Sequence, residues 1–354
     1  MTKPAYPKIL TCSIALPEYT KSTDQIIEDM EQHLVGQDER FKKKVLRIFK
    51  YAQVDRRYSI MSAEEVLAQL SFEEKNDIYK ERMTDLAEKA LREAIQEAKM
   101  SPKDIDYIIS VSCTGFMIPS IDAYLINRLD MRQDVVRLPV TEMGCAAGVS
   151  ALIYANQFLR ANPGKTAAIL AVESPMATFQ WNDFSMANMV SAAIFGDGVA
   201  CAIVGHDDEV KPAILDTNMY HFFDQTHMMG FDLKNSGFKM VLDPTVPETI
   251  KAHFEDILFP FLERNNLEIS EIDHLIFHPG GKKIIQMVEE LFGALGKNLN
   301  VTRQVLREFG NMSSATVLYV LHEFLKNPIQ AGEKGIMLSF GPGFSAQSIL
   351  LEWR

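Results

Sequence analysis

The chain has 354 residues, of which 47% are hydrophobic and 23% charged, a composition typical of a globular protein with a large core. Its formal net charge of −11 argues against nucleic acid as a partner, because a polyanion would be repelled. No apolar run reaches the length of a membrane span, and residues 1–8 lack the layout of a signal peptide, so we expect a cytoplasmic protein.

Apolar runs and periodicity predict alternating strands and helices in the first part of the chain. In order, these are a strand over 9–16, a helix beginning at 22–24, a helical run over 40–50, a long helix that follows a capping box at 71–74 and includes 83–98, a strand over 105–112, a helix from about 120, a strand over 136–140, a helix ending near 159, and a strand over 167–172. Residues 179–188 are predicted to form a loop, and 194–200 a strand around a glycine turn.

The second part repeats this alternation after a stretch without a clear period. The predicted elements are a loop over 220–236, a strand over 238–242, a helix over 246–264, a strand over 274–278, a helix from about 283, a segment over 301–309, a helix after 311, and two closing strands around 341–343. Strands that feed helices in this way favour an open mixed sheet covered by helices.

Four cysteines are spread along the chain, at Cys12, Cys113, Cys145 and Cys201. They form no CxxC pair and no cluster with histidine at the spacing of metal ligands. The sequence therefore predicts neither disulfides nor a bound metal.

Cys145 stands between small residues, after a strand and at the start of a helix. Small neighbours would let a substrate approach the sulfur, and the helix N-terminus would favour a thiolate there. The alternative is that Cys145 is an inert, buried hydrophobic side chain.

The chain also matches itself at a nearly constant offset. The stretch that begins Gly144-Cys145 lies over the one that begins Gly310-Asn311, at an offset of 166 residues (311 minus 145). Residues 105–109 and 169–170 lie over 272–276 and 337–338 at offsets of 167 and 168. Matches in the same order predict two similar α/β halves. Packed about a pseudo-twofold axis, these halves would place Asn311 at the position equivalent to Cys145.

His278 ends a predicted strand just before a glycine turn, close to the sheet edge where sites form in α/β proteins. A structural role for this histidine is the alternative. Taken with Cys145 and Asn311, it completes a Cys-His-Asn set whose roles fit acyl chemistry.

Five motifs together resemble type III polyketide synthases, the chalcone synthase-like enzymes. They are Gly144-Cys145, Phe195-Gly196-Asp197-Gly198, His278-Pro279-Gly280-Gly281, Gly310-Asn311-Met312-Ser313-Ser314-Ala315 and Gly341-Pro342-Gly343-Phe344. The resemblance implies a thiolase-like five-layer αβαβα fold of two duplicated halves, 1–208 and 209–354, and a homodimer. It also implies iterative decarboxylative condensation of malonyl-CoA onto an acyl-CoA starter, with CoA thioesters as substrates and no further cofactor.

The same resemblance implies residue roles. Cys145 would carry the growing chain, and His278 and Asn311 would bind thioester carbonyls. Phe195 and Phe238 fall where the family has two gatekeeper phenylalanines, which would exclude water. We expect an imidazolium at His278 to hold the Cys145 thiol ionised, since a free thiol is mostly protonated at neutral pH.

The basic run over 40–50 is either a solvated helix face or a site for CoA phosphates. By resemblance to plant enzymes, the phosphate-binding positions are Lys44, Arg47 and Tyr51. Tyr51 departs from the basic residue of those enzymes, so Lys43 or Lys50 would take over its contact. Substrate-binding roles are further expected for Cys113, Ser313 and Gly280; Cys113 is a cavity-wall residue or a second reactive thiol.

Residues 229–239 are similar to bacterial alkylpyrone and alkylresorcinol synthases, which accept long fatty acyl-CoA starters. We therefore expect a fatty acyl starter and release as an alkyl-α-pyrone, with aldol closure to a resorcinol as the alternative. The 18 methionines could line a flexible acyl tunnel or simply fill the core. Rival interpretations are a ketoacyl-ACP synthase III-like enzyme with a single condensation, a silent acyl-CoA-binding scaffold, and a Cys/His metal site.

Overall fold

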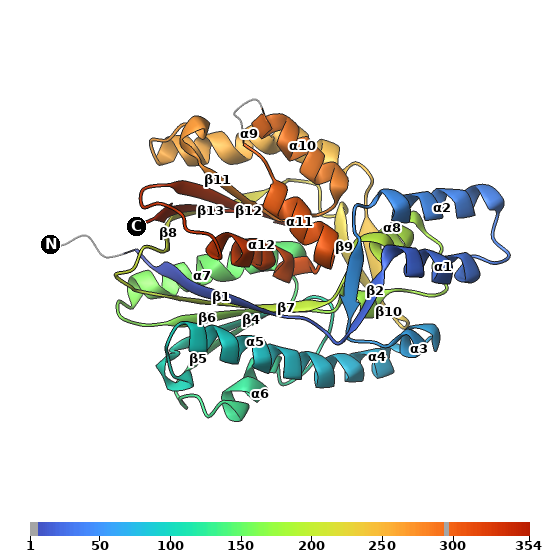
Figure 1. The fold of residues 1–354 in the computed structure, drawn as a ribbon, viewed down its shortest axis with the longest axis horizontal. Helices are drawn as coiled ribbons and strands as arrows, with labels where there is room; N and C mark the ends of the chain where they lie inside the picture. The colour runs from blue at the N-terminus through green and yellow to red at the C-terminus, as the bar shows by residue number, and fades with distance from the viewer. Residues whose placement is uncertain (1–5, 294–296) are drawn as a thin grey trace.

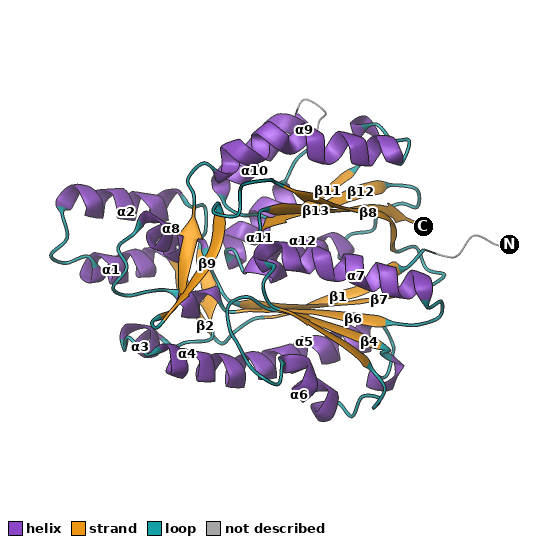
Figure 2. Cartoon of the chain, turned by 180° about the vertical axis from the view of Figure 1, so that it is seen from behind, coloured by secondary structure: helices purple, strands orange, loops and turns teal. Residues whose placement is uncertain are grey.

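Five layers, helices alternating with sheets, make up the chain in a computed structural model that describes residues 6–293 and 297–354 (Figures 1 and 2). The two sheets are joined edge to edge at β1 and β8, where Lys8 pairs with Ala213. Together their strands form a continuous order β11-β12-β13-β8-β1-β7-β6-β4-β5. Their bounds are β1 Lys8–Ala15, β4 Tyr107–Val111, β5 Val136–Val140, β6 Ala167–Glu173, β7 Gly198–Gly205, β8 Pro212–His221, β11 His274–Phe277, β12 Lys334–Gly341 and β13 Ser345–Trp353.

The predicted duplication is confirmed by strand order and direction. In one half, β4 pairs parallel to β6, and β6 and β1 each pair antiparallel to β7. In the other half, β11 pairs parallel to β12, and β12 and β8 each pair antiparallel to β13. The matched residues 105–109 and 272–276 thus lead into equivalent strands.

The central layer is formed by helices that lie between the two sheets, α7 (Ala147–Ala161) and α12 (Thr316–Leu325), with α11 (Asn300–Phe309) beside them (Figure 2). Side chains of α7 such as Val149, Leu152 and Leu159 are fully buried. A helix covered on both sides can be apolar almost all round, which explains the alanine-rich sequence of α7.

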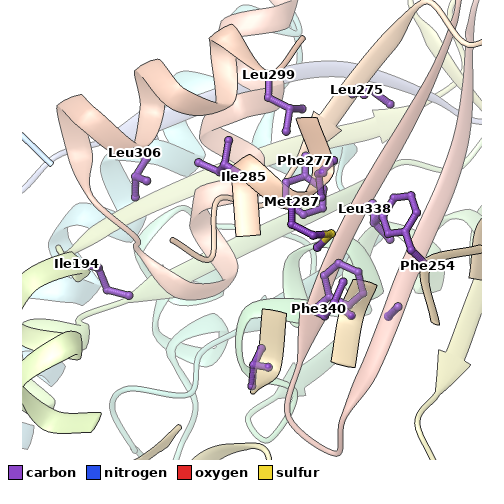
Figure 3. Close-up of a cluster of buried hydrophobic side chains, with 14 of the residues drawn as sticks. Ile194, Phe254, Leu275, Phe277, Ile285, Met287, Leu299, Leu306, Leu338 and Phe340 are labelled. Atoms are coloured by element: carbon purple, nitrogen blue, oxygen red, sulfur yellow. The ribbon is translucent and has the colours of Figure 1, made fainter. Parts of the chain in front are cut away.

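Each outer face is covered by a pair of helices. One pair is α5 (Thr84–Glu97) and α6 (Ile121–Arg128), and the other is α9 (Val246–Arg264) and α10 (Lys282–Gly293) (Figure 2). Figure 3 shows the apolar cluster under the second pair, in which Phe254 of α9 belongs to the same cluster as Phe277 and Phe340 of the sheet. Such packing holds the ends of β11 and β12 in place.

The remaining elements form an extension at one end of the layers (Figure 1). They are β2 (Tyr19–Ser22), α1 (Thr23–His33), α2 (Glu39–Tyr51), β3 (Arg56–Ser59), α3 (Ala63–Leu67), α4 (Phe72–Ile78), a π-helical turn (Tyr79–Met83), α8 (Met186–Ile194), β9 (Met229–Lys234) and β10 (Gly237–Leu242). The capping box at Ser71 and Glu74 starts α4 as predicted, and α4 runs through the π-helical turn into α5.

Two predicted loops were partly wrong. Residues 220–236 contain β9, which pairs antiparallel with β10. Its side chains are half-buried or exposed and do not alternate, so the period of two was missing from the sequence. Within 179–188, α8 begins at Met186 with Ser185 as its N-cap, and it runs on to Ile194, where a strand was predicted. The helix α11 occupies the unassigned segment 301–309.

Among the described helices, none is both long and apolar enough to cross a bilayer. Of the residues 1–8 that bear on a signal peptide, 1–5 lie outside the described part of the chain.

Candidate active site

Cys145 lies in a short 3₁₀ turn, Gly144–Ala146, which leads directly into α7. Gly144 has a φ of +49°, and a Cβ there would lie 2.5 Å from Cδ of Pro342. Glycine is therefore required for the turn to pack against the loop that follows β12. The thiol is held at a helix start, as the sequence predicted.

The equivalent turn of the other half packs against this one. A Cβ on Gly148 of α7 would lie 2.3 Å from the carbonyl oxygen of Ser314, in the 3₁₀ turn Ser313–Ala315 that leads into α12. Because the two backbones approach so closely, Cys145 and Asn311 line the same cavity.

The Asn311 amide has a fixed orientation. Its Oδ1 accepts hydrogen bonds from the Ser313 backbone N–H at 2.9 Å and from Thr316 Oγ1 at 3.2 Å. Because both partners are donors, the amide atom that faces them must be the oxygen. No acceptor for Nδ2 is found among the described residues. The NH₂ group is left to serve as a donor in the cavity.

His278 follows β11 and faces the same cavity. Its backbone N–H donates to Leu338 O at 3.0 Å, and its carbonyl accepts from Gly280 N–H at 2.9 Å. The side chain is 3% exposed, and neither ring nitrogen has a hydrogen-bond partner among the described residues. The three predicted catalytic residues thus meet at a cavity of about 90 Å³.

Burial favours the neutral forms of both Cys145 and His278. It raises the pKa of the Cys145 thiol to about 12 and lowers the pKa of the His278 imidazole to about 3. Cys145 Sγ is hydrogen-bonded to Ser313 Oγ at 3.6 Å, and the described hydrogen bonds include none between Cys145 and His278. The thiolate–imidazolium pair expected from the sequence must therefore overcome the cost of burying two charges.

Phe195 lines the Cys145 cavity, whereas Phe238 does not. Phe238 lines an adjoining cavity of about 700 Å³, and its ring centroid lies 5.7 Å from that of Phe231. Phe231 lines both cavities and is the aromatic wall that the sequence interpretation missed. Its position in a predicted loop concealed it. Phe231 pairs with Met240 and Phe238 with Leu233, so the two phenylalanines are diagonal neighbours that can be recognised only once the β9–β10 hairpin is known.

Cys113, Ser313 and Gly280, for which substrate-binding roles are predicted, also line the Cys145 cavity. Behind Cys113 lies Glu173, a fully buried carboxylate that the sequence interpretation did not select. It accepts hydrogen bonds from the Cys113 N–H at 3.1 Å and from Thr114 Oγ1 at 2.6 Å. In the sequence, Glu173 is recognisable as an acidic residue at the end of the otherwise apolar strand β6.

The basic helix α2 lies outside the lining of this cavity. Lys44 and Arg47 are exposed, and no described carboxylate pairs with either. The ring of Tyr51, which is 60% exposed, has the Arg47 guanidinium 5.6 Å from its centroid and the Lys282 ammonium 5.7 Å from it. Lys282 begins α10, between Gly280 and Ile284, which both line the cavity. Cations of α2 and α10 therefore meet close to the cavity.

A second apolar cavity of about 400 Å³ adjoins the first. The two share Phe195, Pro175 and Met240 as lining residues. Besides Met240, its methionines are Met30, Met61 and Met176. Phe195 thus stands between the thiol and a larger apolar space.

Comparisons with known proteins identify the family. The N-terminal domain model of chalcone and stilbene synthases matches residues 4–208, and the C-terminal domain model of the same enzymes matches residues 215–353. The chain is 30% identical to the phloroglucinol synthase of Pseudomonas fluorescens, with 96% of this chain and 97% of that protein covered. It is 35% identical to the 1,3,6,8-tetrahydroxynaphthalene synthase of Streptomyces peucetius over 76% of this chain and 72% of that protein.

A solved structure agrees with these matches. The crystal structure of the Streptomyces coelicolor 1,3,6,8-tetrahydroxynaphthalene synthase, a bacterial type III polyketide synthase, superimposes with a TM-score of 0.92. It is 28% identical and is covered to 99%, with 98% of this chain included. The match confirms the thiolase-like fold. The two family models favour a type III polyketide synthase over the ketoacyl-ACP synthase III-like interpretation. The chain belongs to the chalcone and stilbene synthase family and is a type III polyketide synthase.

Proposed function

We propose that this enzyme loads a fatty acyl-CoA starter onto Cys145, extends it two or three times with malonyl-CoA, and releases an alkyl-α-pyrone. The observation that carries the proposal is the apolar cavity of about 400 Å³ that shares Phe195 with the catalytic cavity. A space of about 90 Å³ is too small for a long acyl chain, since ligand pockets usually measure about 300–1,000 Å³. The cavity of about 400 Å³ would hold the acyl chain that the catalytic cavity cannot.

The lining of that cavity supports an aliphatic occupant. Its four methionines present flexible thioether side chains, which adapt to apolar ligands of varied shape. Burying the chain there would contribute about 0.8 kcal/mol for each methylene group removed from water. The Cys145 thioester would stay in the catalytic cavity while the alkyl tail passes Phe195.

Three residues would carry the bond-forming steps. Cys145 Sγ attacks the starter thioester, and CoA leaves as a thiolate. The enolate that forms when malonyl-CoA loses CO₂ then attacks the acyl group, and the carbon–sulfur bond to Cys145 breaks. The extended chain, now carried by CoA, is transferred back to Cys145 with release of CoA. Negative charge develops on a thioester oxygen in these steps, and donors aimed at it can supply several kcal/mol in a dry site. The free Nδ2 of Asn311 and the unpartnered ring of His278 support their assignment as those donors.

Binding of the CoA phosphates is assigned to Arg47 and Lys44 of α2 together with Lys282 of α10. Arg47 and Lys282 both lie within cation–π distance of the Tyr51 ring, so the ring can hold both cations while carrying no charge of its own. The third cation would thus come from another helix, instead of from Lys43 or Lys50 as expected from sequence. Arg47→Gln and Lys282→Gln should each raise the KM for malonyl-CoA with little change in kcat, and Lys283→Gln is the matched control.

Release as a pyrone requires no reactant other than the bound chain. An enol oxygen of the extended chain attacks the thioester carbonyl, the carbon–sulfur bond to Cys145 breaks, and a six-membered lactone leaves. Aldol closure to a resorcinol would instead form a carbon–carbon bond within the chain. Product masses and fragmentation distinguish the two outcomes.

The test uses acyl-CoAs of graded length with malonyl-CoA, and products are identified by mass spectrometry. Ala192 lines the large cavity, so Ala192→Phe should reduce kcat/KM for the longest starters by about 10–200-fold while sparing short ones. Ala187→Phe, on the same helix but outside the lining, is the control. Turnover of short or aromatic starters alone by the unmodified enzyme would refute the fatty acyl assignment.

We further propose that the enzyme is a homodimer. The loop after β4 exposes Ile118 by 83% and Phe116 by 50%, and Phe116 borders the adjoining cavity of about 700 Å³. Large exposed apolar side chains beside a cavity are typical of a surface that packs against another protein, here a second copy of this chain. Light scattering should give twice the chain mass of 40.0 kDa. In Ile118→Asp the measured mass should shift toward that of the monomer.

A further inference from the structure

A buried glutamine links the β9–β10 hairpin to the segment that follows β6. Gln180 is 7% exposed, and its Nε2 donates hydrogen bonds to Thr178 O at 3.0 Å and to Phe238 O at 3.2 Å. One side-chain amide thus uses both of its N–H donors on two backbone carbonyls. The second of these carbonyls belongs to the residue whose ring lines the cavity of about 700 Å³.

The backbone of Gln180 is itself fixed by α8. Asn188, in the first turn of α8 and 2% exposed, accepts from the Gln180 N–H through Oδ1 at 3.3 Å and donates through Nδ2 to Gln180 O at 2.8 Å. The same Nδ2 donates to Asp183 O at 2.7 Å. The helix leads directly into Phe195, its C-cap residue. A series of contacts therefore runs from the helix that positions Phe195, through Asn188 and Gln180, to the backbone of Phe238.

Gly237 allows the hairpin to come this close. Its φ is +108°, and a Cβ at this position would lie 3.1 Å from Phe72 Cδ2 and 3.5 Å from Gln180 Nε2. The Phe72 ring packs at 90° against that of Phe238, with 5.5 Å between the centroids. The cavity that these four residues help to line measures about 10 Å³, which is room for one water at most. On this side, the hairpin has little space into which it could move.

A second polar contact joins β10 to the segment after β6. Lys239 Nζ lies 3.7 Å from Asp183 Oδ2, and the lysine side chain is 45% exposed. Exposed ion pairs contribute little because solvent screens them. The buried amide of Gln180 is therefore the stronger of these two links.

We propose that Gln180 is a positioning residue that keeps Phe238 in place, so that water stays away from the Cys145 thioester while it waits for the enolate. The proposal rests on the acyl transfer proposed for Cys145 above. Gln180 lines neither the Cys145 cavity nor the cavity of about 700 Å³, so it acts through the backbone of Phe238 and does not touch the reacting groups.

Hydrolysis is the side reaction that a displaced Phe238 would permit. Water adds its oxygen to the acyl carbon, the carbon–sulfur bond to Cys145 breaks, and one proton of the water ends on the sulfur. The products are a free acid and the thiol, so the starter is lost without extension. The two cavities share Cys113, Gly144 and Phe231 as lining residues, which gives water in the larger cavity a path to the thioester.

Two variants disturb this contact in independent ways. Gln180→Leu has an apolar side chain of similar size and lacks both donors. Gly237→Ala keeps the glutamine but pushes the hairpin away from it, and it carries the test if Gln180→Leu does not fold. The matched control is Gln347→Leu, because Gln347 is also buried and donates through Nε2 to Ser345 Oγ at 3.0 Å, far along the chain from the hairpin.

The experiment follows the acyl-enzyme in the absence of malonyl-CoA. The full chain is loaded with the best-loading member of a series from acetyl-CoA to dodecanoyl-CoA, and mass spectrometry measures the acyl group on Cys145 and the free acid over time. We expect Gln180→Leu and Gly237→Ala to release the acid about five- to tenfold faster, since loss of one buried hydrogen bond shifts an open–closed equilibrium by that factor. The KM for the starter should change little, and Gln347→Leu should behave like the unmodified enzyme.

A double-mutant cycle shows whether the effect passes through Phe238. In the Phe238→Leu background, adding Gln180→Leu should change hydrolysis little, because the ring that it positions is already gone. An additive effect in that background would overturn the proposal, and so would equal hydrolysis in Gln180→Leu, Gly237→Ala and the unmodified enzyme.

Failure of this proposal can be told apart from failure of the proposed function. An acyl group that loads on Cys145 and is lost at equal rates in all variants refutes the role of Gln180 alone. If no member of the series loads on Cys145, the proposed acyl transfer is refuted, and the role of Gln180 with it.

Discussion

The backbones of Phe195 and Asn311 lie side by side as a parallel bridge. The Asn311 N–H donates to Ile194 O at 2.7 Å, and the Gly196 N–H donates to Asn311 O at 3.1 Å. The ring that lines both cavities and the amide that lines the cavity of Cys145 are therefore fixed to each other. Under the proposed function, starter selection and carbonyl binding would be coupled through this contact.

Asn311→Asp should abolish most decarboxylation. The carboxylate still accepts from the Ser313 N–H, so the turn is kept, but the donor toward the thioester oxygen is lost and a negative charge takes its place. Loss of one such donor typically costs about 10²–10³-fold in kcat. Release of labelled CO₂ from malonyl-CoA measures the effect, and an unchanged rate would remove Asn311 from the oxyanion site.

Phe195→Leu should change the length of the accepted starter. A smaller side chain widens the passage between the two cavities, so kcat/KM for bulky and long acyl-CoAs should rise relative to kcat/KM for short ones. Phe231→Leu is the comparison, since Phe231 lines the Cys145 cavity but not the large apolar one. Competition between two acyl-CoAs in one reaction gives the ratio of kcat/KM directly. The assignment of Phe195 fails if both variants shift this ratio alike.

Gly148→Ala should destabilise the enzyme. The added Cβ would lie 2.3 Å from Ser314 O, and backbone must move to relieve the clash. Overpacking in a tight core costs about 1–3 kcal/mol in the free energy of unfolding. In Gly205→Ala, by contrast, the nearest atom is Leu10 Cδ1 at 3.2 Å, the end of a flexible side chain, so its loss should be smaller. Urea unfolding of both variants provides the check, and equal losses would contradict the close approach of the two turns.

The ion pair of Glu65 and Arg82 should make stability depend on pH. Arg82 donates to both carboxylate oxygens at 2.6 Å, and this hydrogen bonding lowers the pKa of Glu65 to about 2 from its usual 4.5. A lowered pKa in the folded state contributes stability above pH 4.5, which is lost as the pH falls toward 2. Because the pair is partly exposed, Glu65→Gln should cost about 0.5–1 kcal/mol at pH 7.

Urea unfolding at a series of pH values tests this prediction. The difference between Glu65→Gln and the unmodified enzyme should shrink as the pH falls from 4.5 toward 2. A difference that stays constant over this range would mean that the pair contributes no charge-dependent stability.

Much of the catalytic site could be predicted because it is encoded locally. Cys145 and Asn311 each stand at a helix start marked by glycine and small residues, and the internal offset relates one to the other. His278 follows an apolar strand and precedes a glycine turn. Short motifs of this kind fix both the element and the position of the side chain within it.

What the sequence did not reveal depends on contacts between distant segments. Phe231 became visible only through the pairing of β9 with β10, and Lys282 only through the approach of α10 to Tyr51. The hydrogen bond between Cys145 and Ser313 joins the two halves, and no spacing along the chain predicts it. The burial that shifts the pKa values of Cys145 and His278 likewise depends on the whole fold.

The close approach of Gly148 to Ser314 has a consequence for how the molecule can move. Under the proposed function, the nucleophile belongs to one half of the chain and the carbonyl-binding groups to the other, so catalysis would need both halves held in one arrangement. A rotation of one half against the other would have to separate the two turns or slide them past each other. A ligand that wedges the two turns apart is therefore expected to inhibit the enzyme without entering the cavity.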